Sequence, residues 1–186
     1  MMNKKEYLEE FNYLSFTAGM NQRYHQYEWT RYSRIDKQIR ASVGIISIFG
    51  LILSLLTLNM QTLTLNILSI IIATIALGIA MILNIYPSGQ KANYHQSLLE
   101  KWSYIWEDVE SQKIAVQLSK SNEIPSEVSV RLRELYSKVN QINGTENSPN
   151  KELLDKCYEE ENKARTGFRT QEELDEARAK SVSIRK

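Results

Sequence analysis

Side chains that could carry acid–base, nucleophilic or metal chemistry are few and scattered in this 186-residue sequence. Imidazoles occur only at His25 and His95, and the single thiol is Cys157. The two histidines could form a metal pair or a protonation switch if their segments pack together, but two polar residues on a helix surface are the simpler interpretation. The sequence contains neither a glycine-rich phosphate loop nor a clustered metal-ligand spacing. It therefore predicts a protein that is not an enzyme and that needs no cofactor.

A basic and aromatic run, RYHQYEWTRYSRIDKQIR from Arg23 to Arg40, has the composition of an anion-binding segment. Nucleic acid is not the expected partner, because the net charge of the chain is only +1 and phosphate contacts need a strongly basic surface. We expect contacts with anionic lipid headgroups, which are worth about 1 kcal/mol per charge. The alternative is an anionic ligand such as a nucleotide signal, for which Arg23 is a further candidate. The residues proposed for lipid or ligand are Arg31, Arg34, Lys37, Arg40 and Lys91.

Between Arg40 and Lys91 the chain carries no charged residue, and small or polar residues recur there at helical spacing. Small side chains let two membrane helices approach closely, and hydroxyl or amide groups form hydrogen bonds across them. The simpler prediction is that at least one stripe packs two spans together; the other is that several copies assemble around a neutral, hydrated path with Arg40 and Lys91 at its mouth. The candidates for span packing or pore lining are Ser47, Gly50, Ser54, Asn66, Ser69 and Asn84.

The charge-free block has the length of two membrane spans. A bilayer core is about 30 Å thick and takes roughly 20 helical residues, so Ala41 to Gln90 is too long for one span. We expect spans over residues 42–58 and 63–85, joined by a turn at 59–62. Within lipid every backbone polar group needs an internal partner, which favours a helical hairpin over a strand in TLTLN. A buried hairpin in a soluble protein is the alternative, but the polar flanks could not enclose two helices that are apolar on all sides.

Positive charges near the spans predict the orientation of the hairpin. Arginine and lysine precede the first span and follow the second, whereas the turn carries neither. The start of the chain is charged and amphipathic, so we expect the first span to serve as its own signal anchor. The sequence thus predicts a multi-pass inner-membrane protein with both termini in the cytoplasm.

The segments on both sides of the hairpin are expected to be helical. We divide them into residues 1–40, which Gly19 could break into two helices, a stalk over 87–145 and a C-terminal tail over 146–186. Apolar residues at spacings of four and three form a stripe in the stalk that should pack against the stripe from Tyr24 to Ile39. A second stalk helix is expected over 126–142. A tail helix should follow, with Ser148 as its cap and Pro149 at its first helical position. The stripe consists of Tyr94, Leu98, Trp102, Ile105 and Val109.

The layout resembles the SLATT family of bacterial two-transmembrane effectors. The features that carry this resemblance are the RYHQYEWTRYSRIDKQIR helix, two spans with a very short turn, and the long amphipathic helix YHQSLLEKWSYIWEDVE. The resemblance covers roughly residues 20–165 and supplies no catalytic residues. It implies a partner sensor, either a nucleotide cyclase or a reverse transcriptase, and a nucleotide signal. The tail sequence LLDKCYEEENKARTGF suggests the branch found beside reverse transcriptases.

Taken together, these features predict an all-α membrane protein, a transmembrane hairpin continued by cytoplasmic amphipathic helices. The resemblance implies an antiphage effector that oligomerises and perforates the inner membrane on a cytoplasmic trigger. Two spans cannot enclose a pore, so a homo-oligomer is expected. The other candidate is a membrane scaffold that recruits a cytoplasmic enzyme to the bilayer without perforating it.

Overall fold

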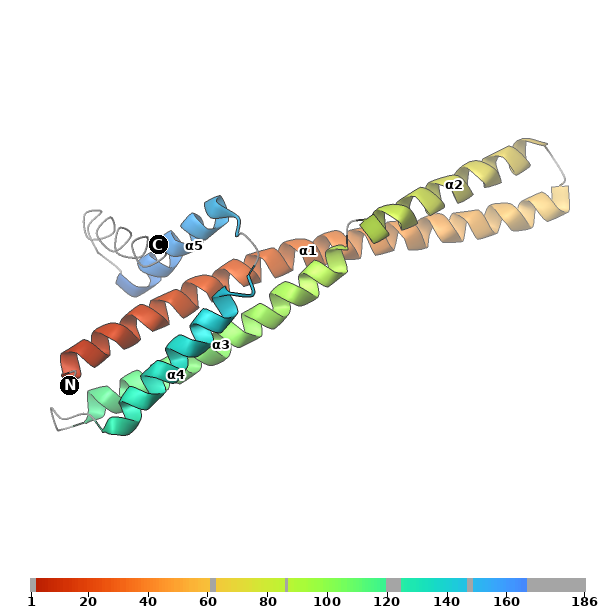
Figure 1. Cartoon of the computed structure of the whole chain (residues 1–186). Coiled ribbons are helices and arrows are strands. Elements are labelled where there is room, and N and C mark those ends of the chain that lie inside the picture. Colours follow the sequence, from red (N-terminus) through yellow and green to blue (C-terminus); the bar gives the residue numbers. More distant parts are fainter. Residues whose placement is uncertain (1–2, 61–62, 86, 120–124, 147–148, 167–186) are drawn as a thin grey trace. The chain divides into compact units, whose positions relative to one another are not determined.

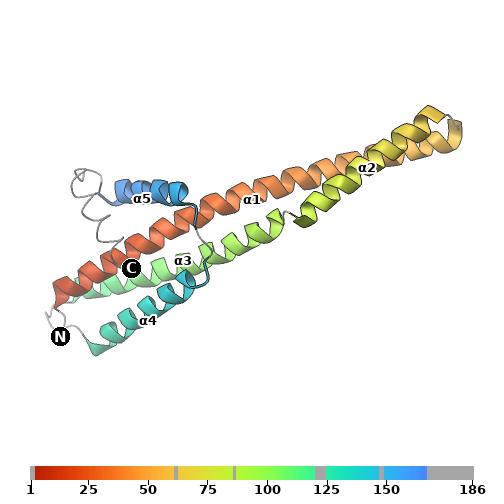
Figure 2. The same ribbon diagram turned by 45° about the horizontal axis from the view of Figure 1, so that its top comes forward.

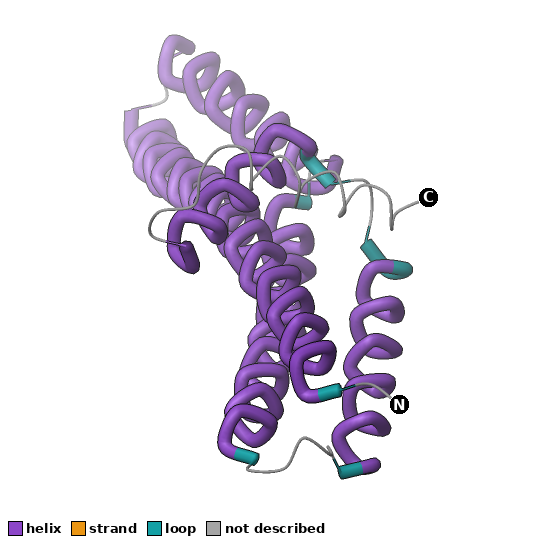
Figure 3. Tube along the Cα trace, turned by 90° about the vertical axis from the view of Figure 1, so that its left-hand side faces the viewer, coloured by secondary structure: helices purple, strands orange, loops and turns teal. Residues whose placement is uncertain are grey.

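The computed structural model describes residues 3–60, 63–85, 87–119, 125–146 and 149–166. Within these ranges the chain forms helices joined by short connections, with no strand, so the predicted all-α class is confirmed (Figure 3). The helices are α1 (Lys4–Met60), α2 (Leu63–Ile85), α3 (Ser88–Leu118), α4 (Ser126–Asn143) and α5 (Lys151–Thr166) (Figure 1).

The chain divides into two compact units. Met1–Gln26 and Ser97–Lys186 form the first unit, and Tyr27–Gln96 forms the second. Helices α1 and α3 each contribute residues to both units. The first unit therefore contains the start of α1, most of α3, and all of α4 and α5, while the second contains the apolar part of α1, all of α2 and the start of α3.

The first unit has a helical core in which buried residues recur every three or four positions on α1, α3 and α4. This spacing places them on one side of each helix, as in a coiled-coil seam. Helix α4 lies along α3 in this unit (Figure 2). Polar contacts fix α4 against both partners: the Tyr136 hydroxyl hydrogen-bonds Glu10 of α1, and Arg131 Nη2 lies 2.7 Å from Asp108 Oδ2 of α3. The buried side chains are Tyr7, Phe11, Leu14 and Ala18 of α1, Leu98, Trp102, Ile105, Val109 and Val116 of α3, and Leu132, Leu135, Val139 and Ile142 of α4.

Of the stripe predicted on α3, Leu98, Trp102, Ile105 and Val109 are buried in this core, whereas Tyr94 belongs to the second unit and is partly exposed. The helix predicted over 126–142 is also present, and it extends one residue further. Within this unit the α1 residues that share the core begin at Tyr7, well before the stripe from Tyr24 that was expected to be the partner. The heptad-like spacing of Tyr7, Phe11, Leu14 and Ala18 could have identified these core residues from the sequence.

Helix α5 docks on α1 through a small apolar cluster. Cys157 is buried together with Met20 and Tyr24 of α1, and Leu153 and Tyr158 pack against the same cluster. The helix begins at Lys151, and Leu153 N donates a 3.3 Å hydrogen bond to Asn150 Oδ1, so Asn150 is the capping residue. The expected cap at Ser148 lies outside the described residues, as do Gly167 and the rest of the tail.

Gly19 does not break α1, which runs without interruption from Lys4 to Met60. A Cβ added at Gly19 would lie 2.7 Å from Cδ of Glu161 on α5, closer than real Cβ contacts. The expectation of two helices was therefore wrong: glycine leaves room here for the Glu161 carboxylate of α5, and a single glycine inside a long packed helix costs only about 1 kcal/mol.

The second unit is built around a helical hairpin. Helix α2 has the bounds predicted for the second span, whereas α1 continues to Met60, two residues beyond the predicted end of the first. Asn59 is therefore helical and not part of a turn, and residues 61–62 lie outside the described ranges. Helices α1 and α2 lie side by side in this unit (Figure 1). Pro87 separates α2 from α3, as expected of a residue that cannot continue a helix.

Candidate functional site

The apolar parts of α1 and α2 make two helices that are long and apolar enough to cross a membrane. No residue in either apolar window is buried within the chain. Large side chains face outward along both helices, with Leu51 64% exposed and Ile70 66% exposed. In water, such a continuous apolar surface would be strongly unfavourable, so the outward faces suit hydrocarbon and argue against a buried soluble hairpin.

A seam of partly buried residues joins the two helices of the hairpin. A Cβ added at Gly50 of α1 would contact Ile72 Cγ2 of α2 at 3.5 Å, so the backbone of α1 approaches α2 closely at this point. Spacings of three and four on both helices match the packing of antiparallel helices in membranes and coiled coils. The partly buried positions are Val43, Ile46, Gly50, Leu53 and Thr57 on α1, and Leu65, Ser69, Ile72, Ala76 and Ile79 on α2.

Only some residues of the predicted small-residue stripes lie in the seam. Gly50 and Ser69 lie in it, as span packing requires, whereas Ser47, Ser54 and Asn66 are exposed on the outer faces. Asn84 belongs to α2, but its side chain lies outside the described part of the structure. Each stripe therefore contributes to packing through one subset of its residues and presents the other subset to the surroundings.

Hydroxyl groups on the hairpin are satisfied by their own helices. Ser47 Oγ donates to the Val43 carbonyl at 2.8 Å, and Ser54 Oγ donates to the Gly50 carbonyl at 2.9 Å. Such bonds to the preceding turn allow a hydroxyl to face lipid at little cost. Ser69 differs, because its Oγ atom is buried and has no hydrogen-bond partner among the described residues.

Charged side chains of α1 and α3 gather beside the hairpin. We call this group the collar; it consists of Asp36 and the basic candidates Arg31, Arg34, Lys37, Arg40 and Lys91. Arg40 Nε is 2.6 Å from Asp36 Oδ2, and the Ser88 hydroxyl donates to Asp36 Oδ1 at 3.2 Å. The hydrogen bond from Arg40 lowers the pKa of Asp36 below its ordinary value. Sequence reasoning selected Arg40 as a contact for lipid or an anionic ligand and missed its pairing with Asp36, although a spacing of four on a helix was the signal for the pair.

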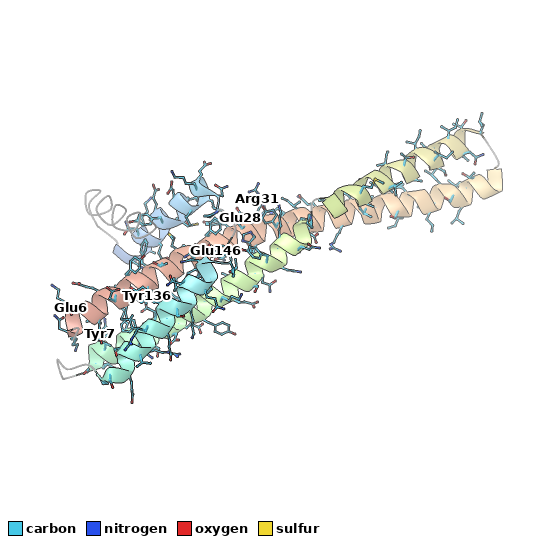
Figure 4. All side chains as sticks on the ribbon, viewed as in Figure 1. Glu6, Tyr7, Glu28, Arg31, Tyr136 and Glu146 are labelled. Atoms are coloured by element: carbon cyan, nitrogen blue, oxygen red, sulfur yellow. The ribbon has the colours of Figure 1, made fainter. Side chains whose placement is uncertain are left out.

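The other basic candidates of the collar differ in their surroundings. Lys91 Nζ lies 5.3 Å from the centre of the Tyr32 ring, which also stacks on His95 at 5.6 Å and 9°. Arg31 is near the same ring and pairs with the buried Glu28, one turn earlier on α1, at 3.8 Å (Figure 4). Arg34 and Lys37 are exposed, so these two residues remain accessible to headgroups. The structure thus gathers Arg31 and Lys91 around Tyr32.

His25 occupies a buried polar layer of the first unit that the sequence did not predict. Its Nε2 lies 3.0 Å from Oε1 of Glu146, and Trp102 Nε1 donates to the same oxygen at 3.1 Å. The His25 side chain is only 2% exposed. The simple interpretation of a surface histidine was therefore wrong, since Glu146 in the connection after α4 gives this imidazole a partner inside the unit.

The described residues contain no group of three or more histidine, cysteine or acidic side chains that could hold a metal ion. Comparison of the chain with protein-family models, with curated proteins and with solved structures gave no match. The outward-facing residues of the hairpin and the collar are thus the features from which a function can be argued.

Proposed function

We propose that this protein is the membrane-damaging effector of a bacterial antiphage system. In this proposal it belongs to the SLATT family, spans the inner membrane twice with both termini in the cytoplasm, and forms a homo-oligomer. A cytoplasmic trigger, delivered by a partner sensor, converts the oligomer into a pore or a membrane lesion. Growth arrest or cell death follows from the loss of the membrane barrier.

The observation that carries the proposal is the outward placement of Ser47 and Ser54. The two residues are seven positions apart and exposed, so they share one face of α1 outside the seam with α2. A hairpin that only anchors a protein gains nothing from hydroxyl groups on a lipid-facing surface. In an oligomer, the same face with Asn66 of α2 provides a weakly polar lining without any buried charge, which suits a crude and weakly selective pore.

The collar supports the cytoplasmic orientation of this proposal. Exposed Arg34 and Lys37 lie within a few turns of the apolar part of α1 and suit the anionic inner leaflet. Amphipathic helices of the first unit would then lie in the cytoplasm, where they hold the hairpin silent or receive the trigger.

Substitution of the outward face tests the proposal. Ser47→Leu combined with Ser54→Leu should abolish toxicity and dye uptake in cells that express the complete system, while insertion into the membrane is unchanged. Ile52→Leu, a conservative change at another exposed position of α1, is the control and should retain full toxicity. Full toxicity of the double serine variant would contradict pore lining by this face.

A groove in the first unit favours a second candidate, the membrane scaffold. It has a volume of about 750 Å³ between α3 and α4, and Tyr104 at its edge is 72% exposed. Exposed aromatic residues beside a groove are common at protein interfaces. For a scaffold, the serine variants above should retain partner recruitment, and Tyr104→Ala should abolish it.

A further inference from the structure

A hollow of about 550 Å³ lies in the first unit where α1, α3 and α5 meet. Three cationic side chains line it, namely Arg23 from α1, Lys113 from α3 and Arg165 from α5. Glu110 and Glu161 line it as well. Three cations against two carboxylates leave an excess of one positive charge (3 − 2 = +1), so the hollow favours an anion over a neutral or cationic ligand.

Glu161 already occupies part of this site as an internal anion. Its Oε2 lies 2.8 Å from Nε of Arg23, and its Oε1 lies 2.5 Å from Nε of Arg165. The Glu161 side chain is only 7% exposed, so a single buried carboxylate is shared by two guanidinium groups. The planar donor fork of arginine matches phosphate oxygens as well as carboxylate oxygens. A phosphate group could therefore replace Glu161 at these two residues.

The third cation comes from α3. Lys113 is 3.1 Å from Glu110 and its side chain is 19% exposed. Glu110 also accepts a hydrogen bond from Ser15, whose hydroxyl in turn accepts one from Nη2 of Arg165 at 2.7 Å. This chain of contacts links Lys113 to Arg165 through neighbouring side chains, so the cations from α3 and α5 belong to one connected network.

Trp106 supplies a flat apolar surface beside these charges. It lines the same hollow and is 37% exposed, although large aromatic side chains of a packed bundle are more often buried. An indole ring can stack on flat ring systems, and base–aromatic stacking is worth about 1–3 kcal/mol. The hollow thus combines a surface for a ring with cations for a phosphate.

We propose that this hollow binds a small phosphate ester that carries a flat ring. The phosphate lies between Arg23, Arg165 and Lys113, the ring lies on Trp106, and Glu161 is displaced from both arginines. Loss of that ion pair weakens the docking of α5 on α1. This inference rests on the proposed function in naming the cytoplasmic trigger, but the binding itself is measurable without any membrane lesion.

Calorimetric titration of the detergent-solubilised full chain tests the ligand class with three probes. ADP contains both phosphate and ring, pyrophosphate lacks the ring, and adenosine lacks the phosphates. ADP should bind about tenfold more tightly than pyrophosphate, as expected for one stacking contact, and adenosine should not bind detectably. Equal affinity for ADP and pyrophosphate would overturn the role of Trp106 and with it the ligand class, and absence of binding by all probes would overturn the site.

Variants of the two carboxylates that neighbour each other on α5 test the displacement of Glu161. Glu161→Gln removes the competing charge, so ADP affinity should rise about tenfold, the equivalent of one charge-assisted contact. Glu160→Gln removes a nearby charge that pairs with Lys156, and should leave the affinity unchanged. Unchanged or weaker ADP binding by Glu161→Gln, with helicity and thermal midpoint near those of the control, would overturn the displacement.

Removal of one cation from the hollow tests the phosphate contacts independently. Lys113→Gln should weaken ADP binding about tenfold. Lys138→Gln on α4 removes a cation that pairs with Asp108 and does not line the hollow, so it should not change the affinity. If ADP binds as proposed but membranes stay intact in cells, the function proposal fails and the site stands. If membranes are damaged but no probe binds, the site fails and the function stands.

Discussion

Gly50 of α1 lies against Ile72 of α2, since a Cβ added at Gly50 would come within 3.5 Å of the Ile72 Cγ2 atom. The same addition at Gly44, on the same helix, meets no atom within 4 Å. A separation of 3.5 Å is ordinary van der Waals contact, so alanine fits at Gly50 but a larger side chain does not. Gly50 therefore lies in the packed seam of the hairpin, whereas Gly44 is exposed outside it.

Leucine at these two glycines should have unequal effects on the hairpin. Gly50→Leu forces α1 and α2 apart and should lower the free energy of unfolding by about 1–3 kcal/mol, the usual cost of overpacking. Gly44→Leu is the matched control and should cost far less. Thermal unfolding of both variants in detergent checks this, and equal losses would contradict the packing of Gly50 against Ile72.

Alanine at Gly19 should loosen α5 and expose Cys157. Burial raises the pKa of the Cys157 thiol to about 11, so at pH 8 the group is protonated and shielded, and a maleimide should label it slowly. Gly19→Ala pushes the Glu161 carboxylate away from α1 and should raise the labelling rate about tenfold, as expected for about 1.4 kcal/mol of weakened docking. Gly44→Ala serves as the control, and identical rates in the two variants would count against the docking of α5 at Gly19.

Stability of the first unit should depend on pH through Glu110. Burial opposes ionisation of this carboxyl, but hydrogen bonds from Ser15 and Lys113 outweigh it, and the pKa is lowered from 4.5. A carboxyl whose folded pKa is depressed stabilises the fold above its unfolded pKa, and the contribution is lost as the pH falls through the folded pKa. Wild type should therefore lose stability below pH 4.5 more steeply than Glu110→Gln in acid titrations followed by circular dichroism. Parallel curves would exclude this role of Glu110.

Removal of the His25 imidazole should destabilise the buried polar layer. His25→Leu removes the partner that lies 3.0 Å from Glu146 Oε1, at an expected cost of about 1–3 kcal/mol. In the double variant with Glu146→Gln, the total loss of stability should be smaller than the sum of the losses in the two single variants, because the two residues share one contact. Additive losses in thermal unfolding would show that the contact does not contribute to stability.

The sequence predicted the parts of this fold that follow from local patterns. The absence of charge between Arg40 and Lys91 was sufficient to locate α2, whose bounds were correct, and the spacing of Leu98, Trp102 and Ile105 identified the buried side of α3. These features depend on the period of a helix and on the thickness of a bilayer, both of which are visible in one segment at a time.

Features that depend on distant partners could not be predicted. Glu146 meets His25 across 121 positions of the chain, and no local pattern marks that pair. Whether Gly50 or Ser54 enters the seam depends on the rotation of α1 about its axis, which is set by α2. Gly19 resembled a helix breaker because the residue that approaches it closely, Glu161, belongs to another helix.

Membrane integrity during triggered growth arrest tests the central claim most directly. The chain should be expressed together with its neighbouring genes, and membrane potential and uptake of an impermeant dye should be followed after phage infection. The proposed effector predicts depolarisation and dye uptake at the onset of growth arrest, and their loss in the variant that combines Ser47→Leu with Ser54→Leu. Growth arrest with a polarised membrane that excludes the dye would contradict it.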